Sequence, residues 1–504
     1  MIYVHIPFCR SFCTYCDFYS EVAPKCRERE HEQSRMFGRF SQALKQEISL
    51  RADEITDEYN TIYIGGGTPS VLPLSVYSDL VGHLAEVGIH PPFKEFTFEL
   101  NPEDVVEAGE PYIRGLMDLG VDRFSMGVQS FDDGILKWMN RRHDSQTARR
   151  AYGILEQAGA ENISIDLIFG LPQLDDRMWM DTIANALAIS PSGKLPCHIS
   201  AYQLSVEPGS ALAAMVEKGV WSEASQEQCA RQYGILCDML ARKGYHHYEI
   251  SNFALPGFEA KHNGAYWRHV PYVGLGPGAH SLLITQSSED DSPQGHGRPD
   301  CLSVFCSKIP DPGAASDDAL LITQSPEGDS PQGHGRPDCL SVFCSKIPDP
   351  GAASDDALLI TQSPEGDSPQ GHRRPDCLSV FCPKIPDPGA ASDDALLITQ
   401  SPEGDSLQGY RRQWNEPDLE AYMKNPTGCR GCEELTREQV GMEKVMLELR
   451  TSSGAEEDFL LSFCGKSAVD AAMADGNLIR TGNGNLRIPE DRFFISDSII
   501  TGLI

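Results

Sequence analysis

"HIPFCRSFCTYCDFY", residues 5–19, places Cys9, Cys13 and Cys16 within eight positions near the start of the sequence. Thiolates are soft ligands that select zinc, copper(I) or iron–sulfur clusters. A closed zinc site takes four ligands, often from two CxxC pairs, whereas this CxxxCxxC segment supplies three. Three thiolates can hold three irons of a [4Fe–4S] cluster and leave the fourth iron open. The spacing favours such a cluster, with zinc and an incidental grouping as the alternatives.

The composition is that of a soluble globular protein. With 504 residues, 40% of them hydrophobic, the chain can bury a large core, and its length predicts two or three domains. No basic stretch followed by an apolar run opens the sequence, and no apolar window is long enough for a membrane span. We therefore expect a cytoplasmic protein, in which clustered cysteines indicate metal binding or catalysis more often than disulfides.

The charge is strongly acidic, and much of it is local. The formal net charge is −31, which disfavours nucleic acid or an anionic membrane as a partner because both need a positive surface. Residues 282–409 hold 21 acidic residues against 7 Lys and Arg. The remainder of the chain is only moderately acidic.

A tandem repeat interrupts the chain. Residues 320–357 recur at 358–395 almost unchanged, an earlier copy occupies 282–319 and a partial one ends at 409, so the period is 38 residues. A fixed period can indicate a solenoid. The units are rich in Pro and Gly and their apolar runs are short, which favours a disordered insertion. We expect residues 282–409 to be that insertion.

The flanking segments predict an α/β fold. Short apolar runs alternate with longer helical patterns through residues 1–281, which is typical of βα units around a parallel sheet. Candidate strands are 1–6, 61–67, 95–102, 123–129, 163–170 and 198–205, and candidate helices are 37–55, 70–87, 103–119, 132–157 and 175–189. Six such units predict a (β/α)6 partial TIM-type barrel. Residues 410–504 predict a small, mostly helical C-terminal domain with a capped helix starting near Thr436.

The segment "YVHIPFCRSFCTYCDF" resembles the signature of radical S-adenosylmethionine (SAM) proteins, in particular the branch of coproporphyrinogen dehydrogenases and HemW haem chaperones. Further segments resemble that branch in order and approximate spacing: "YIGGGTPSVL", "FELNPEDV", "RFSMGVQSFDDGILKWMNRRH", "ISIDLIFGLP", "YEISNFALPGFEAKHNGAYW" and "YVGLGPGAHS". The resemblance covers residues 1–281 well and 410–504 more weakly. It implies a radical SAM barrel in which SAM chelates the open iron of a [4Fe–4S] cluster held by the three cysteines.

Other motifs fit a SAM site. The turn "GGGTP" follows a candidate strand, where glycines let the backbone approach a ligand. Glu99, Gln129 and Asp166 fall near the ends of candidate strands, at the rim where barrel proteins place their working residues. For any one of them, a strand-end cap or a surface ion pair is the alternative. The resemblance implies SAM binding by Tyr3, Tyr15, Gly66, Gly67, Thr68, Glu99, Gln129, Arg141 and Asp166.

Two functions follow from the resemblance. Coproporphyrinogen dehydrogenases, which decarboxylate through a 5'-deoxyadenosyl radical, carry a fourth cysteine two residues after the third, where this chain has Phe18. Phenylalanine there is the HemW-like pattern, and it favours a haem chaperone without porphyrinogen oxidase activity. Such a chaperone could either cleave SAM or only bind it. The implied partners are haem, haem-accepting proteins such as respiratory haemoproteins, and an electron donor that reduces the cluster. Membranes are approached only through the acceptors.

Remaining candidates concern haem, redox chemistry and the repeats. His262 in "KHNGAYW" is the candidate haem ligand, with a hydrogen-bonded structural histidine as the alternative. His246 and His247 are adjacent strand residues that point to opposite faces, so one site cannot easily use both. Cys429 and Cys432 form a CxxC pair that can be redox-active or half of a zinc site. A last alternative is an interaction protein that works through its acidic repeats.

Overall fold

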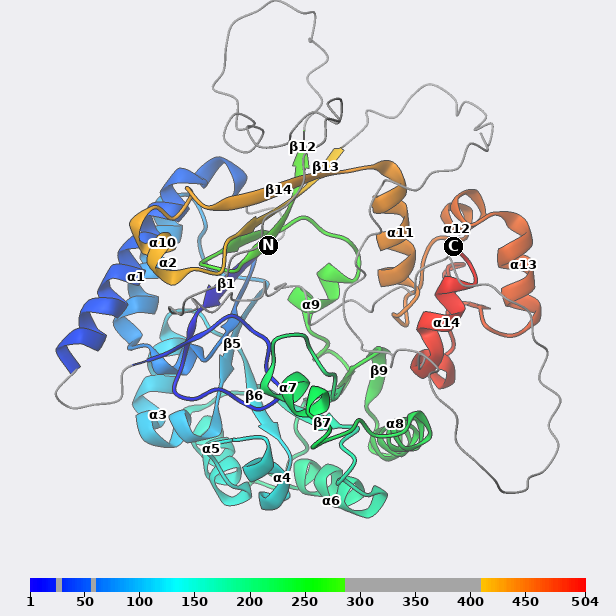
Figure 1. The fold of residues 1–504 in the computed structure, drawn as a ribbon, viewed down its shortest axis with the longest axis horizontal. Helices are drawn as coiled ribbons and strands as arrows, with labels where there is room; N and C mark the ends of the chain where they lie inside the picture. Colours follow the sequence, from blue (N-terminus) through cyan, green and yellow to red (C-terminus); the bar gives the residue numbers. More distant parts are fainter. Residues whose placement is uncertain (24–29, 56–59, 286–408) are drawn as a thin grey trace, which may run out of the picture.

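The computed structural model describes residues 1–23, 30–55, 60–285 and 409–504. Its centre is a nine-stranded sheet in the order β11-β1-β4-β5-β6-β7-β8-β10-β9. Pairing is parallel from β11 to β8 and antiparallel from β8 through β10 to β9. The sheet ends at β11 on one side and at β9 on the other, so the barrel is open (Figure 1).

The six predicted strands all form, and they make up the parallel part of the sheet together with β11. Their bounds are β1 (Ile2–Ile6), β4 (Thr61–Gly66), β5 (Glu95–Leu100), β6 (Arg123–Gln129), β7 (Asn162–Phe169) and β8 (His198–Gln203). The additional strands are β9 (His246–Glu249), β10 (Asn252–Ala254) and β11 (Val273–Leu275). This arrangement confirms the predicted α/β fold with a (β/α)6 partial barrel.

Helices cover the outside of the sheet (Figure 1). They are α1 (Glu30–Leu50), α2 (Leu74–Glu86), α3 (Pro102–Asp118), α4 (Asp133–Trp138), α5 (Ser145–Ala158), α6 (Asp176–Leu187) and α8 (Gln226–Ala241). Two further helices lie elsewhere: α9 (Lys261–Tyr266) packs against the polar inner face, where His262 hydrogen-bonds with Thr61, and α7 (Ala211–Glu217) contacts the loop after β1. The single helix predicted over 132–157 was wrong. It divides into α4 and α5, because Asn140 takes a left-handed φ of 58° and Asp144 accepts a hydrogen bond from Thr147 N as the N-cap of α5.

The strands alternate between an apolar outer face and a polar inner face. In β5, Phe96 and Phe98 are buried in the hydrophobic core, while Thr97 between them is buried and polar. The same alternation runs through β6 and β7. Because successive side chains of a strand point to opposite faces, the outer residues pack under the helices and the polar ones line the barrel.

The chain continues from the barrel into a second, three-stranded sheet. β12 (His280–Thr285) pairs antiparallel with β13 (Gly409–Asn415), which pairs with β14 (Arg430–Leu435). Residues 282–285 and 409 therefore lie in strands, although the sequence placed them in the insertion. The rest of that predicted insertion, 286–408, lies outside the described residues. The helix α10 (Leu419–Lys424) follows β13.

The last part of the chain is mostly helical. It contains α11 (Arg437–Glu448), α12 (Glu457–Phe463), α13 (Lys466–Ala474) and α14 (Ser496–Thr501), with the short strands β15 (Ile479–Arg480) and β16 (Leu486–Arg487). Thr436 caps α11 and forms a reciprocal capping box with Gln439, as the sequence predicted. A 3₁₀ turn, Glu490–Ile495, leads into α14.

A buried polar network ties the segment after residue 408 to the barrel. Glu47 of α1 is fully buried and accepts hydrogen bonds from Arg51 Nη1 (3.0 Å), Asn415 Nδ2 (2.8 Å) and the Tyr422 hydroxyl (2.7 Å). Arg51, also buried, donates to the Gly274 carbonyl at 2.6 Å. Buried charges need such partners. The network therefore joins α1, β11, β13 and α10.

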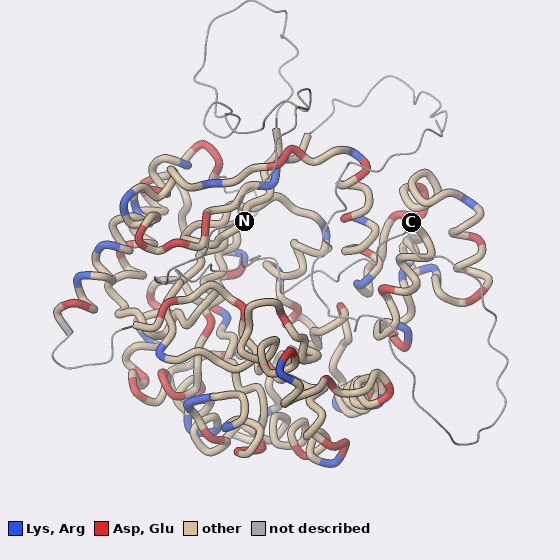
Figure 2. Tube along the Cα trace, viewed as in Figure 1, with Lys and Arg blue, Asp and Glu red and all other residues tan. Residues whose placement is uncertain are grey.

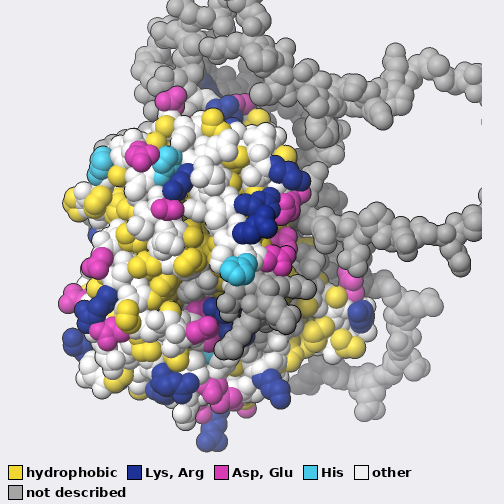
Figure 3. Space-filling view, turned by 90° about the vertical axis from the view of Figure 1, so that its left-hand side faces the viewer, with side chains coloured by type: hydrophobic (Ala, Val, Ile, Leu, Met, Phe, Trp, Pro, Cys, Tyr) yellow, Lys and Arg dark blue, Asp and Glu magenta, His cyan; other side chains and the backbone are white. Residues whose placement is uncertain are grey.

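The surface mixes both charge signs. Figure 2 shows acidic and basic residues interspersed over the described helices. On the face shown in Figure 3, hydrophobic side chains form a band between charged ones. Large apolar side chains left exposed include Phe12 and Val220. None of the described helices combines the length and the hydrophobicity needed to cross a lipid bilayer.

We predict that residues 286–408 can be replaced by an Asn-Gly turn. Thr285 and Gly409 are the terminal pair of the β12–β13 ladder, and a two-residue turn closes such a hairpin. The shortened chain should keep a melting temperature within about 4 °C of the full chain, measured by circular dichroism, and the same iron content after reconstitution. Loss of folding or of iron would instead favour the acidic repeats as a required part.

We also predict that Glu47→Leu destabilises the fold. The substitution removes one of the two carboxylates that pair with the buried Arg51 guanidinium, since Glu54 still accepts from Nε at 2.6 Å, and it also leaves the Asn415 and Tyr422 donors without their acceptor. It should lower the free energy of unfolding by about 3 kcal/mol. Urea unfolding followed by circular dichroism measures this change. Tyr422→Phe, which removes only one hydrogen bond to the same carboxylate, should cost about 1 kcal/mol. Equal effects of the two substitutions would contradict the network.

Candidate functional site

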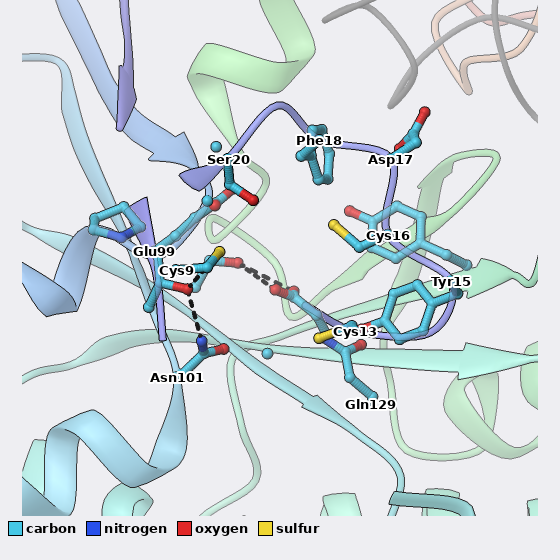
Figure 4. A pocket seen from close by; sticks show the side chains of 18 of the residues that line it. Cys9, Cys13, Tyr15, Cys16, Asp17, Phe18, Ser20, Glu99, Asn101 and Gln129 are labelled. Atoms are coloured by element: carbon cyan, nitrogen blue, oxygen red, sulfur yellow. Dashed lines mark hydrogen bonds between the residues drawn. The ribbon is translucent and has the colours of Figure 1, made fainter. Parts of the chain in front are cut away.

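The three clustered cysteines lie on the loop that follows β1. Cys9 ends the two-residue strand β2 (Phe8–Cys9), which pairs with β3 (Glu21–Val22). Figure 4 shows the sulfur atoms of Cys9, Cys13 and Cys16 directed into one shared space. Within the described ranges, no three His, Cys, Asp or Glu side chains converge closely enough to hold a single metal ion. Separated sulfurs suit the corners of a cluster, where each thiolate binds its own iron.

Neighbouring elements hold this loop at several points. Thr14 donates through its backbone N to the Met139 carbonyl (3.1 Å) and through Oγ1 to the Trp138 carbonyl (2.9 Å). Asn140 Nδ2 donates to the Phe12 carbonyl at 2.6 Å. The turn between α4 and α5, which the sequence had read as helix, is therefore what secures the middle of the cysteine loop.

The glycine turn docks directly on the same loop. Gly67 N donates to the Ile6 carbonyl at 2.8 Å, and Thr68 N donates to the Phe8 carbonyl at 2.7 Å. A Cβ at position 67 would lie 2.7 Å from the Phe8 carbonyl oxygen. Gly66 has a φ of 103°, and its Cβ would lie 2.6 Å from the His5 ring. Both glycines are thus required by close approach within the protein.

A chain of hydrogen bonds connects two of the cysteines. Cys9 Sγ lies 3.4 Å from Thr68 Oγ1, which accepts from Asn101 Nδ2 at 3.1 Å. Asn101 Oδ1 accepts from Arg141 Nη2 at 2.6 Å, and Arg141 Nη1 donates to Cys13 Sγ at 3.5 Å. Sequence reasoning missed Asn101. The signal was its position two residues after Glu99 at the end of β5, where both side chains take the same face.

Two carboxylates lie on the inner face of the barrel. Glu99 accepts from the Tyr63 hydroxyl at 2.6 Å, and Asp166 accepts from Ser125 Oγ at 2.9 Å. Burial is the main cause that raises the pKa of Glu99, to about 7, and the nearby Asp166 charge raises it further. Burial also raises the pKa of Asp166. A cation entering between them would favour both ionised forms.

One cavity of about 290 Å³ brings the predicted residues together. It is lined by the three cysteines and by all nine predicted SAM positions: Tyr3, Tyr15, Gly66, Gly67, Thr68, Glu99, Gln129, Arg141 and Asp166. Its size is near the lower end of the range for small-molecule sites, about 300–1,000 Å³. Gln129 reaches it from the end of β6 with a left-handed φ of 66°, a conformation that is uncommon outside glycine.

The structure does not support the predicted haem ligand. His262 is fully buried in α9. Its Nδ1 hydrogen-bonds with Thr61 Oγ1 (2.9 Å) and its Nε2 with the Tyr266 hydroxyl (3.0 Å). Neither nitrogen is available to an iron at the surface, so the alternative of a hydrogen-bonded structural histidine describes it. His262 is also not among the residues that line the cavity.

The other outlying candidates are also structural or separated. His246 is exposed and His247 is buried, as expected for adjacent strand residues. Cys432 lies in β14, whereas Cys429 immediately precedes it, and both are free and exposed. Neither cysteine lines the cavity that holds Cys9, Cys13 and Cys16.

The residues around the cavity fit an iron–sulfur cluster with a polar cofactor beside it. Three soft ligands from one loop face the same space. Arg141 Nε is buried without a hydrogen-bond partner, so it can donate to a ligand in the cavity that it lines. Orphaned donors of this kind mark functional sites.

Comparison with known proteins identifies the family of this chain. The family model for the radical SAM superfamily matches residues 3–186. "Heme chaperone HemW" of Lactococcus lactis is 37% identical over 281 residues, which cover 56% of this chain and 69% of that protein. "Heme chaperone HemW" of Synechocystis is 34% identical over 282 residues, covering 56% of this chain and 65% of that protein. These alignments therefore span about two thirds of the relatives' length.

A solved structure gives the same fold. Coproporphyrinogen III oxidase (HemN) from Escherichia coli, described as a radical SAM enzyme, aligns with a TM-score of 0.59 at 16% identity and covers 100% of this chain and 89% of that one. At this identity the match shows the fold alone. The sequence relatives and the family model lead to one conclusion. The chain belongs to the radical SAM superfamily, and within it to the HemW family.

Proposed function

We propose that this chain is a cytosolic haem chaperone that binds haem, carries a [4Fe–4S] cluster and SAM, and delivers haem to acceptor proteins such as respiratory haemoproteins. Membership of the radical SAM superfamily implies the cluster and SAM. The observation that carries the proposal is the single cavity into which three thiols, a glycine turn and two strand-end carboxylates project. Haem as cargo rests on the relatives' name, "Heme chaperone HemW".

Cys9, Cys13 and Cys16 would hold the cluster, which supplies electron transfer to SAM when it is reduced by a donor. The protein's own residues position SAM. Glu99 and Asp166 would face the cationic sulfonium and the ribose hydroxyls. The Nε hydrogen of Arg141, which has no partner among the described residues, would donate to the SAM carboxylate, a charge-assisted bond.

The alternative is an oxygen-independent coproporphyrinogen III dehydrogenase. Phe18 argues against it, since the dehydrogenases have a fourth cysteine at this position. Figure 4 shows Phe18 beyond Cys16 on the same loop, and it lines the cavity. An apolar ring there offers no thiol to the substrate. Release of 5'-deoxyadenosine distinguishes cleavage of SAM from binding alone.

We predict that SAM affinity falls at acidic pH. Without ligand, the pKa of Glu99 is about 7, so below this pH the carboxyl must lose a proton when the cation binds. Affinity should therefore be constant above about pH 8 and fall by up to about tenfold per pH unit below about pH 7. Anaerobic equilibrium dialysis of the reconstituted protein measures it. Glu99→Gln should bind weakly with a flat pH profile, and the exposed control Glu86→Gln should behave as wild type.

We predict haem binding without porphyrinogen turnover. After anaerobic reconstitution, haem titration followed by absorbance should give saturable binding, and loaded protein should transfer haem to an apo-haemoprotein. Cys13→Ala should lose the cluster. His262→Gln should keep haem affinity, because both nitrogens of His262 are already engaged.

Two results would contradict this prediction. Decarboxylation of coproporphyrinogen in step with 5'-deoxyadenosine release would establish the dehydrogenase alternative. Loss of haem binding by His262→Gln, with cluster and SAM binding intact, would restore His262 as the ligand.

A further inference from the structure

Asn101 occupies a helix N-cap position without capping the helix. It directly precedes α3, and its side chain makes no hydrogen bond to the first turn of that helix. Asparagine at an N-cap normally accepts such a bond, which stabilises the helix. Here the amide turns instead toward the cavity, where it meets Thr68 and Arg141. The Asn101 side chain therefore bonds to residues beside the cysteine loop in place of the first turn of α3.

The chemistry of the neighbours determines the orientation of the amide. Arginine can only donate hydrogen bonds, so the atom 2.6 Å from Arg141 Nη2 must be the oxygen of Asn101. The nitrogen then faces Thr68 and donates to Oγ1 at 3.1 Å. The threonine hydroxyl accepts this bond, which leaves its own hydrogen to donate to Cys9 Sγ at 3.4 Å.

The other end of the chain also delivers a donor to sulfur. Arg141 Nη2 is shared between Asn101 Oδ1 and the Gly127 carbonyl at 2.7 Å, which holds the guanidinium so that Nη1 reaches Cys13 Sγ at 3.5 Å. Thiolate ligands accept hydrogen bonds and cannot donate them. The Thr68 hydroxyl and Arg141 Nη1 can therefore both donate to a cysteine sulfur that holds a cluster.

We propose that Asn101 is a positioning residue that orients one hydrogen-bond donor toward each of Cys9 and Cys13 and thereby raises the reduction potential of the cluster. The inference rests on the proposed function, since it assumes that these thiolates hold a [4Fe–4S] cluster. Hydrogen bonds to the sulfur ligands are one of the factors that set the potential of such clusters. Residues that hold a ligand through its hydrogen bonds tune a metal site in the same way.

The test compares near-isosteric variants by potentiometric titration of the reconstituted protein, followed by electron paramagnetic resonance. In Asn101→Asp both atoms facing the neighbours accept, so the Thr68 hydroxyl turns to the carboxylate and away from Cys9, while Arg141 keeps its acceptor. The midpoint potential should fall. Thr68→Val, which removes the hydroxyl without adding charge, should also lower it, by less. Thr68→Ser should restore the wild-type value.

Asn185→Asp is the matched control, because it adds the same charge on α6, remote from the cavity, and it should leave the potential unchanged. Iron and sulfide contents are measured for every variant. Unchanged potentials in Asn101→Asp and Thr68→Val, or reduced cluster content as the sole effect, would overturn the inference. A shift in Asn101→Asp alone would show an effect of charge and overturn it too. A wild-type protein that forms no cluster would overturn the proposed function and this inference together.

Discussion

The site depends on the backbone contact between the glycine turn and the cysteine loop. Two amides after β4 donate to two carbonyls around β2, and no side chain larger than hydrogen fits at Gly67 between them. This contact places Cys9 beside Thr68 and thereby starts the chain of bonds that reaches Cys13. Parallel strands β1 and β4 are neighbours in the sheet, so their carboxyl ends lie at the same rim. The turn after β4 and the loop after β1 therefore start next to each other.

The polar inner face of the barrel gives this rim its electrostatic character. Glu99 and Asp166 are held by hydroxyl groups of Tyr63 and Ser125, and burial raises the pKa of both carboxyls. Two partly desolvated acids near each other favour a cationic ligand, since a positive charge relieves both the burial cost and their mutual repulsion. The strands of the barrel carry these groups, and the hydroxyl partners hold both carboxylates in place.

Several features could be found only by bringing distant segments together. Asn101 was not among the residues predicted for the site, and its partners Thr68 and Arg141 are separated from it by 33 and 40 positions. Histidine is a common haem ligand, yet His262 is buried and both of its ring nitrogens form hydrogen bonds, with Thr61 and Tyr266. The break between α4 and α5 occurs at Asn140, which has a left-handed φ and whose side chain donates to the cysteine loop. The periodicity of apolar residues cannot predict this contact.

The sequence alone determined the six strands of the barrel and the cluster-type spacing of the cysteines, and its family resemblance named twelve of the residues that line the cavity. These features are local: strand alternation, helix caps, glycine turns and side chains at strand ends follow from patterns within a few residues. The tertiary structure decided which side chains meet, including the Asn101 relay, the enclosure of His262 and the pairing of β12 with β13 across residues 286–408. Such contacts depend on the packing of segments far apart in the chain, because burial and hydrogen-bond partners are properties of the assembled fold.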